Sequence, residues 1–182
     1  MATEFEPAGF GIGGTIGWAV GGALGGGIAA AAFGLLMWVL DPEIVEAAIP
    51  AIYGFDQSTV LGMSFHLLHG AVLGLVFGFV VTRPWILGII VGADRTETVS
   101  ETGLTLRVIA SGFVFGLAIW AILPVIVLPA WVDAVGGPAA GEFPTAAVES
   151  MIGHMVFGLV LGLVFAVVVN LRGRPFVDVL SE

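Results

Sequence analysis

FHLLHGAVLGLVFG, residues 65–78, is the most informative segment of the chain, because it combines an uncharged apolar run with a four-residue glycine repeat. After His66 the repeat places Gly70, Gly74 and Gly78 four residues apart, and such residues share one face of an α-helix. In lipid, small residues at this spacing allow two helices to approach closely. The stretch therefore predicts a membrane-spanning helix that packs by a glycine face and carries a histidine at the head of that face.

The same pattern recurs in GHMVFGLVLGLVFA, residues 153–166, where His154 is followed by Gly158 and Gly162. Other segments match in the same order along the chain. The matching pairs are FGLLMWVLDP (33–42) with FGLAIWAILP (115–124), and RPW (83–85) with RPF (174–176). Ordered agreement of Trp, Pro, His and Arg-Pro indicates an internal duplication.

The composition is that of an integral membrane protein. Of 182 residues, 58% are hydrophobic and 10% are charged, and the mean hydropathy is +1.10. Soluble domains have roughly 45–50% apolar and about 25% charged residues, so this chain has too little polar surface to cover a water-soluble body. The chain contains no Cys, which excludes disulfides, thiolate metal ligands and cysteine nucleophiles.

Four uncharged stretches are each long enough to cross a bilayer. All five basic residues are Arg, and they fall between the second and third stretches, at the start of the third, or after the fourth. An excess of Arg marks the cytoplasmic side, so four spans place both termini in the cytoplasm of a multi-pass protein of the cell membrane. The predicted spans are 14–40, 60–82, 105–129 and 150–171.

Each repeat unit contains two spans, so the two units have the same orientation about a pseudo-two-fold axis along the membrane normal. The predicted fold is an all-α integral membrane four-helix bundle built from two tandem, same-orientation helical hairpins. Its segments are a cytoplasmic N-terminal segment (1–13), a first transmembrane hairpin (14–82), a cytoplasmic linker (83–104), a second transmembrane hairpin (105–171) and a cytoplasmic tail (172–182).

Glycines at four-residue spacing are predicted to pack the helices against one another. A face of the first span that includes Gly17 and Gly21 is left over for a second copy of the chain or a membrane partner, so a homo-oligomer is expected. On this basis, leucine at both positions should change the oligomeric state. The predicted packing glycines are Gly13, Gly17, Gly21, Gly25, Gly70, Gly74, Gly78, Gly158 and Gly162.

The histidines allow several interpretations. His66 and His154 should lie at matching depth on equivalent helices, where two neutral imidazoles could ligate one metal ion or the iron of one haem b. His69 lies one turn deeper, and its repeat counterpart is Phe157, so it breaks the symmetry. Each histidine could instead bond a backbone carbonyl or a serine hydroxyl across the helix interface, or take part in proton sensing or permeation.

Catalytic motifs are not evident. The sequence shows no P-loop, no G-x-S-x-G and no H-E-x-x-H, and no carboxylate lies in the middle of a span. The net charge of -9 argues against nucleic acid as a partner. The sequence therefore predicts a non-enzymatic scaffold, partner subunit or small-solute passage. The alternative is a b-type cytochrome-like electron carrier that uses His66 and His154.

The duplicated hairpin, the His-xxx-Gly-xxx-Gly helices, the acidic loops and the Arg-only basic residues are similar to a group of small four-helix membrane proteins of halophilic archaea. Some members of that group are catalogued as histidine kinases. The resemblance implies a membrane location and a salt-rich habitat, and it implies no functional residue. The kinase description finds no support in this chain, because no acidic residue accompanies a solvent-exposed histidine and no ATP-binding motif is present.

Overall fold

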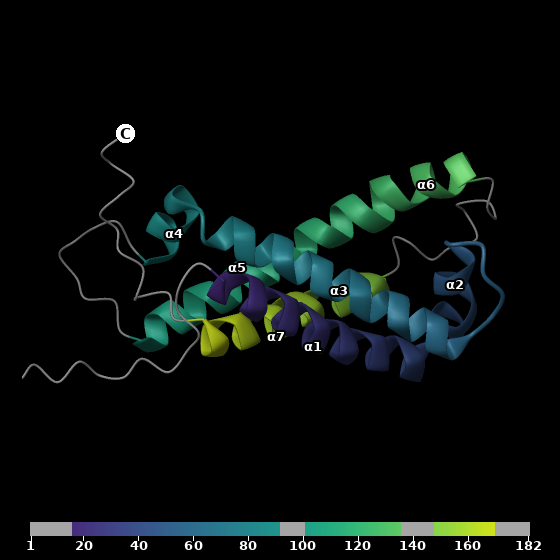
Figure 1. Ribbon diagram of the computed structural model, residues 1–182, viewed down its shortest axis with the longest axis horizontal. Coiled ribbons are helices and arrows are strands. Elements are labelled where there is room, and N and C mark those ends of the chain that lie inside the picture. The colour runs from purple at the N-terminus through teal and green to yellow at the C-terminus, as the bar shows by residue number, and fades with distance from the viewer. Residues whose placement is uncertain (1–15, 92–100, 136–147, 170–182) are drawn as a thin grey trace, which may run out of the picture.

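Four long helices dominate the computed structural model, which describes residues 16–91, 101–135 and 148–169 (Figure 1). Each of the four is long and apolar enough to cross a membrane. They are α1 (Gly17–Leu40), α3 (Thr59–Val81), α5 (Glu101–Ile122) and α7 (Val148–Val168). The prediction of an all-helical chain with four apolar helices is confirmed for the described residues.

Five shorter helical segments join or extend these helices. The turn between α1 and α3 contains the π-helical segment η1 (Ile44–Ala48) and α2 (Ile49–Ala51). Helix α4 (Pro84–Val91) follows α3, and α5 continues through the π-helical segment η2 (Leu123–Val127) into α6 (Leu128–Val135). The third span was predicted to end at residue 129, whereas the helical path runs through to Val135.

Two prolines that correspond in the repeat alignment act differently. Asp41, before Pro42, has an extended backbone (φ -152°, ψ 89°), so α1 ends at Leu40. This is the usual effect of a proline on the residue before it. Pro124 instead lies inside η2, where the wider turn accommodates a residue without an N–H group. The first hairpin therefore turns sharply, while α5 extends into α6.

The helices pack as two hairpins that meet through one helix of each. α1 packs along α3, α5 packs along α7, and the main contact between the hairpins is that of α1 with α7. The colour progression in Figure 1 shows that α1 and α5 run in one direction and that α3 and α7 run in the other. This arrangement places α1 and α7 at the centre.

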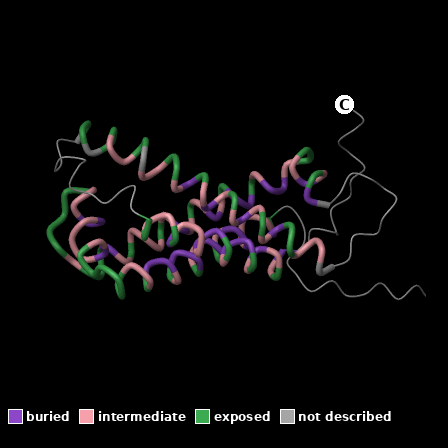
Figure 2. The backbone as a smooth tube through the Cα atoms, turned by 180° about the vertical axis from the view of Figure 1, so that it is seen from behind, coloured by how far each residue is buried: buried purple, intermediate pink, exposed green. Residues whose placement is uncertain are grey.

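The docking of the hairpins departs from the expected two-fold symmetry. Symmetry would pair α3 with α5 as fully as α1 pairs with α7, yet among the described residues α3 makes only slight contact with α5. At one end, α4 lies against both helices and buries Leu87 and Ile90. Toward the other end, α6 diverges from α3, and Figures 1 and 2 both show it standing apart from the bundle. The cause is local, because only the second hairpin has a helix that continues past its proline.

Large apolar side chains fill the centre of the bundle. Leu161 and Phe165 on α7 are fully buried, and Phe77 on α3 packs against Phe165 with ring centroids 5.3 Å apart. Phe115 on α5 also lies 5.3 Å from Phe77, which is one of the few links between α3 and α5. In Figure 2 the buried backbone concentrates in the middle of the bundle. These side chains occupy the space between the four helices.

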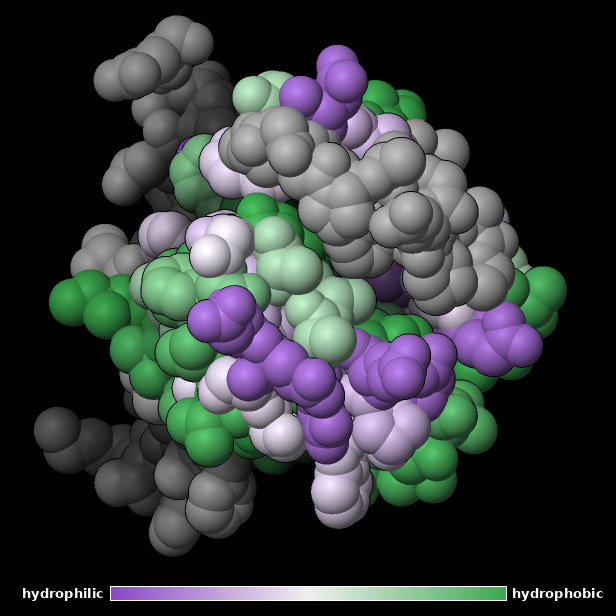
Figure 3. Space-filling model, turned by 90° about the vertical axis from the view of Figure 1, so that its right-hand side faces the viewer, coloured by the Kyte–Doolittle hydropathy of each residue, from purple (hydrophilic) through white to green (hydrophobic). Residues whose placement is uncertain are grey.

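The sides of the bundle are apolar, and the end near α2 is polar. Val60, Val114 and Val167 are 76%, 63% and 65% exposed on the helix flanks. The space-filling view of the α2 end shows hydrophilic residues gathered in its centre (Figure 3). Exposed polar residues of this end include Asp41, Glu43, Asp56 and Gln57. An apolar belt with a polar end is the surface expected of a bilayer-spanning bundle.

Candidate functional site

The structure brings His66 and His154 to one level of the bundle, where both imidazoles contact the ring of Phe33. Phe33 on α1 meets both imidazoles edge-on, with ring centroids 5.3 Å from His66 and 4.8 Å from His154. His66 is on α3 and His154 is on α7, so the contact joins three of the four long helices. Phe33 itself is 5% exposed, so this aromatic layer is buried.

The two imidazoles have different polar surroundings. His154 Nδ1 donates a hydrogen bond of 2.7 Å to the carbonyl oxygen of Ser150, one turn earlier on α7. His66 Nε2 is buried and has no hydrogen-bond partner among the described residues. An unsatisfied polar atom at such a position costs free energy, so His66 is the histidine whose surroundings call for an explanation.

His66 and His154 were predicted to hold one metal ion or one haem iron. The structure gives both imidazoles one neighbour in common, the Phe33 ring, which meets each of them edge-on. Within the described ranges, no three His, Cys, Asp or Glu side chains come together as a metal-binding group. A bis-histidine haem b or metal site at His66 and His154 stays a prediction.

His69 does not join the other two histidines. Its Nε2 shares a hydrogen bond with the hydroxyl of Tyr53, which comes from the turn after α2. Tyr53 also stacks in a tilted arrangement on Phe65, with centroids 4.5 Å apart. The contact fastens the α2 turn to the side of α3, which gives His69 a structural role.

The surroundings of Tyr53 predict a measurable effect of pH on the stability of the protein. Burial raises the pKa of Tyr53 above its ordinary value of 10.0, because the phenolate is less well solvated than in water. Tyr53 is the sole tyrosine of the chain, so an ultraviolet titration of tyrosinate absorbance reports this residue alone. We expect the hydroxyl of Tyr53 to have a higher titration midpoint in the folded protein in detergent than in the denatured protein. Stability should then fall as the pH rises above 10, because the unfolded chain loses the proton first. Identical midpoints for folded and denatured protein would contradict this expectation.

The predicted packing glycines divide among three interfaces. Gly70, Gly74 and Gly78 lie against α1, and Gly158 and Gly162 lie against α5. Gly21 and Gly25 face α7 of the same chain, where a methyl group on Gly25 would lie 3.2 Å from Leu161 Cδ1. Gly17 is buried as well, and Gly13 lies outside the described residues. The face with Gly17 and Gly21 is therefore not left over for a second copy, and the expected leucine effect there is an effect on folding.

Four glycines that were not predicted as packing residues make close backbone contacts. Gly22 and Gly26 meet the backbone of Gly70 and Gly74, where a methyl group on Gly26 would lie 2.9 Å from the Gly74 Cα. On α5, a methyl group on Gly112 would lie 2.8 Å from the Gly162 Cα, and Gly116 meets the backbone of α7 in the same way. The glycine doublets Gly21-Gly22 and Gly25-Gly26 are the sequence feature that could have predicted these contacts. Adjacent residues point about 100° apart on a helix, so paired glycines serve two neighbouring helices.

Gly153 and Gly34 shape the histidine layer. A side chain on Gly153 would overlap the ring of Phe33, so the absence of one lets that ring lie between α3 and α7. A methyl group on Gly34 would lie 3.0 Å from Met63 Sδ and 3.0 Å from His66 Cδ2. Neither glycine was predicted to be a packing residue, because neither belongs to a long run of glycines at four-residue spacing.

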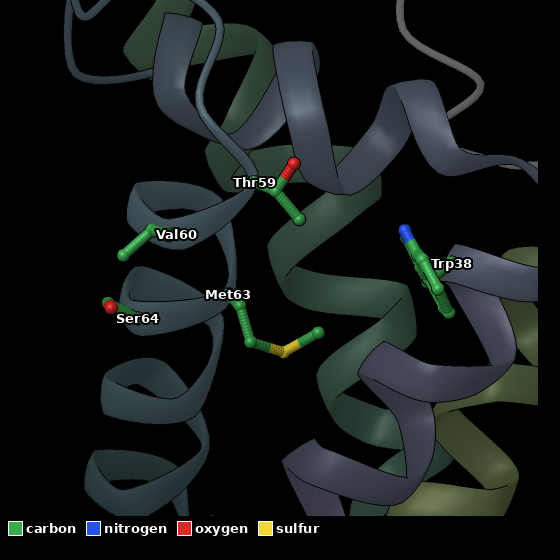
Figure 4. Close-up of a pocket in the computed structure, with 5 residues that line it drawn as sticks. All are labelled: Trp38, Thr59, Val60, Met63 and Ser64. Atoms are coloured by element: carbon green, nitrogen blue, oxygen red, sulfur yellow. The ribbon is translucent and has the colours of Figure 1, made fainter.

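A pocket opens beside this layer, between the end of α1 and the start of α3. It is lined by Trp38, Thr59, Val60, Met63 and Ser64. Figure 4 shows Met63 reaching from α3 toward α1, with Trp38 on the opposite side and Ser64 pointing away. The two helices meet closely at their glycines and separate here, where larger side chains intervene.

Comparisons with known proteins gave no match. No protein-family model, no curated protein and no solved structure shows significant similarity to this chain.

Proposed function

We propose that this chain is a non-enzymatic integral membrane protein that works as an oligomeric scaffold or partner subunit. Its two tandem hairpins cross the cell membrane in the same orientation, with both termini in the cytoplasm. The support for a bilayer location is the set of four long apolar helices with large exposed apolar side chains on their flanks. The filled centre of the bundle is the observation on which the scaffold role rests.

The interior favours a rigid body over a conduit. Within each hairpin, glycines bring two backbones into direct contact, and between the hairpins Phe33, Phe77 and Phe165 are buried. Close packing of this kind leaves little room for a solute to pass between the helices. Any passage formed by this protein would have to run between copies of the chain.

The orientation follows from the charged residues at the two ends. Arg83 lies over the ring of Phe79, with its guanidinium carbon 3.9 Å from the ring centroid, at the end of α3. Arg107 donates a hydrogen bond of 3.1 Å to the carbonyl of Ile90 and so fastens α4 to α5. The opposite end carries exposed Asp41, Glu43 and Asp56. By the positive-inside rule, the arginine end is the cytoplasmic end.

A strip of small residues on the outer face of α1 is the surface that we assign to self-association. Ala23, Gly27 and Ala31 recur every four residues, and a methyl group added to Gly27 would meet no atom within 4 Å. Small residues at this spacing on a lipid-facing surface allow a second helix to approach closely. The strip replaces the face with Gly17 and Gly21, which the chain uses for its own packing.

Gly27→Leu tests this proposal. We expect the variant to fold, because the position is open, and to shift the protein toward the monomer in mild detergent, because leucine holds the helices apart. Sedimentation velocity measures the change. Gly88→Leu is the matched control, since Gly88 on α4 also has open space around it, and its sedimentation should equal that of the unmodified chain. A monomeric unmodified protein, or equal oligomers in both variants, would refute self-association through α1.

Solute flux in proteoliposomes of monomeric Gly27→Leu protein would refute the filled interior.

A further inference from the structure

A methionine precedes each of the two paired histidines by three residues. Met63 precedes His66 on α3, and Met151 precedes His154 on α7, so the pattern M-x-x-H occurs once in each repeat. Residues three apart lie on one helix face, where their side chains can reach a common atom. The pattern therefore places a thioether sulfur beside an imidazole at the level of the aromatic layer.

In the first repeat the structure places both side chains against the same residue of α1, Gly34. Met63 Sδ and His66 Cδ2 are each 3.0 Å from the position that a methyl group on Gly34 would occupy. Cδ2 is bonded to Nε2, the buried ring nitrogen that has no hydrogen-bond partner among the described residues. This nitrogen therefore has unused bonding capacity, on the same helix as the Met63 sulfur and near the same residue of α1.

Met63 also connects the pair to the surface. Its side chain lines the pocket between α1 and α3, and Val60 at the same pocket is 76% exposed (Figure 4). An ion that enters the pocket would meet the thioether first, and the imidazole of His66 lies one turn farther along α3. At Gly34 the neighbouring atoms belong to the Met63 and His66 side chains and not to backbone, so both groups can turn toward the ion.

The second repeat lacks this opening. The counterpart of Gly34 is Gly116, where a methyl group would meet the backbone of α7 and lie 3.1 Å from the Gly158 Cα. The backbones of α5 and α7 are thus in direct contact at this level. His154 also uses its Nδ1 to bond the Ser150 carbonyl. The structure therefore offers one such site in each chain.

We propose that Met63 Sδ and His66 Nε2 bind monovalent copper. Thioether and imidazole are soft or intermediate ligands, a combination that selects Cu+ over hard divalent cations, which prefer oxygen. A bound ion would satisfy the buried nitrogen and would leave the Phe33 ring in place. The site needs no residue of the second repeat, and it does not depend on the oligomeric state proposed above. The event is binding alone, so the ion keeps its oxidation state.

An anaerobic titration with Cu+ against a chromophoric competitor such as bicinchoninate tests the proposal in the full-length protein in detergent. We expect one equivalent of Cu+ to bind, and Ag+, a redox-inert soft cation, to displace it. Met63→Leu keeps the volume and apolar character of the side chain and removes the sulfur ligand. It should weaken binding at least as much as the roughly 10- to 100-fold that loss of an outer-shell partner costs a metal site.

Met155→Leu is the matched control, because it removes a sulfur next to His154 that is not part of an M-x-x-H pair. Its Cu+ affinity should equal that of the unmodified protein. His66→Leu should abolish binding, and X-ray absorption of the loaded protein should show both sulfur and nitrogen neighbours. Failure of the unmodified protein to compete with bicinchoninate would overturn the site, as would equal affinities of the Met63→Leu and Met155→Leu variants. Neither result would bear on self-association, which the sedimentation of Gly27→Leu decides.

Discussion

Gly26→Ala should destabilise the protein strongly, whereas the same change at the next residue should not. The new methyl group at position 26 would overlap the carbonyl oxygen of Gly70 and lie 2.9 Å from the Gly74 Cα. Backbone atoms cannot rotate aside as a side chain can, so α1 and α3 must separate along the contact. Overpacking in a tight interior typically costs roughly 1–3 kcal/mol, occasionally more, and a backbone obstacle places this case at the upper end.

Gly27→Ala provides the internal comparison for this prediction. A methyl group there meets no atom within 4 Å, and alanine forms helix more readily than glycine, so the variant should equal or exceed the parent in stability. Unfolding in sodium dodecyl sulfate, followed by far-ultraviolet circular dichroism, measures both variants. If Gly26→Ala and Gly27→Ala unfolded at the same detergent fraction, the backbone contact between α1 and α3 could not be the main link of the first hairpin.

The second large effect concerns the aromatic layer. Gly153→Ala should be destabilising, because its methyl group would overlap the Phe33 ring, which contacts both His66 and His154. Phe33→Ala should also be destabilising, by about 3–5 kcal/mol, since it removes a buried phenyl ring from the contact between the hairpins. The two losses have one structural origin, namely the space that the ring occupies between α1 and α7.

A double-mutant cycle separates this explanation from a general weakening of the bundle. In the Phe33→Ala background the methyl group introduced at position 153 has no ring to overlap, so Gly153→Ala should cost little. The coupling free energy between positions 33 and 153 should then fall within the range of roughly 0.5–3 kcal/mol seen for residues in direct contact. Additive losses in the same unfolding measurement would show that the Phe33 ring does not lie against α7.

The histidine layer could be predicted from the sequence only in part. The equal depth of His66 and His154 could be expected from the repeat, and both rings do meet one phenylalanine. The shared phenylalanine could not be expected, because the pattern of α3 and α7 contains no information on which side chain of α1 meets the two histidines. Met63 was within reach of the sequence, since M-x-x-H precedes both histidines, yet only the neighbours of Gly34, which are side chains and not backbone, distinguish the first copy from the second.

Four apolar helices could be predicted from the amino-acid pattern alone. Long apolar stretches are poorly solvated in water, so their number and length specify four such helices, and glycines every four residues specify faces that pack closely. Which faces meet depends on the packing of the folded chain. Gly21 and Gly25 serve α7, and the adjacent Gly22 and Gly26 serve α3.

The tertiary structure also decided the symmetry. Two copies of a hairpin sequence predict two equivalent contacts, but α1 packs along α7 while α3 barely meets α5. Pro42 ends α1, whereas Pro124 is absorbed by a π-helical turn that lets α5 run on into α6. The physical reason is that hydropathy and spacing act within one helix. The choice of neighbour instead depends on differences in packing between helices, which similar sequences resolve in different ways.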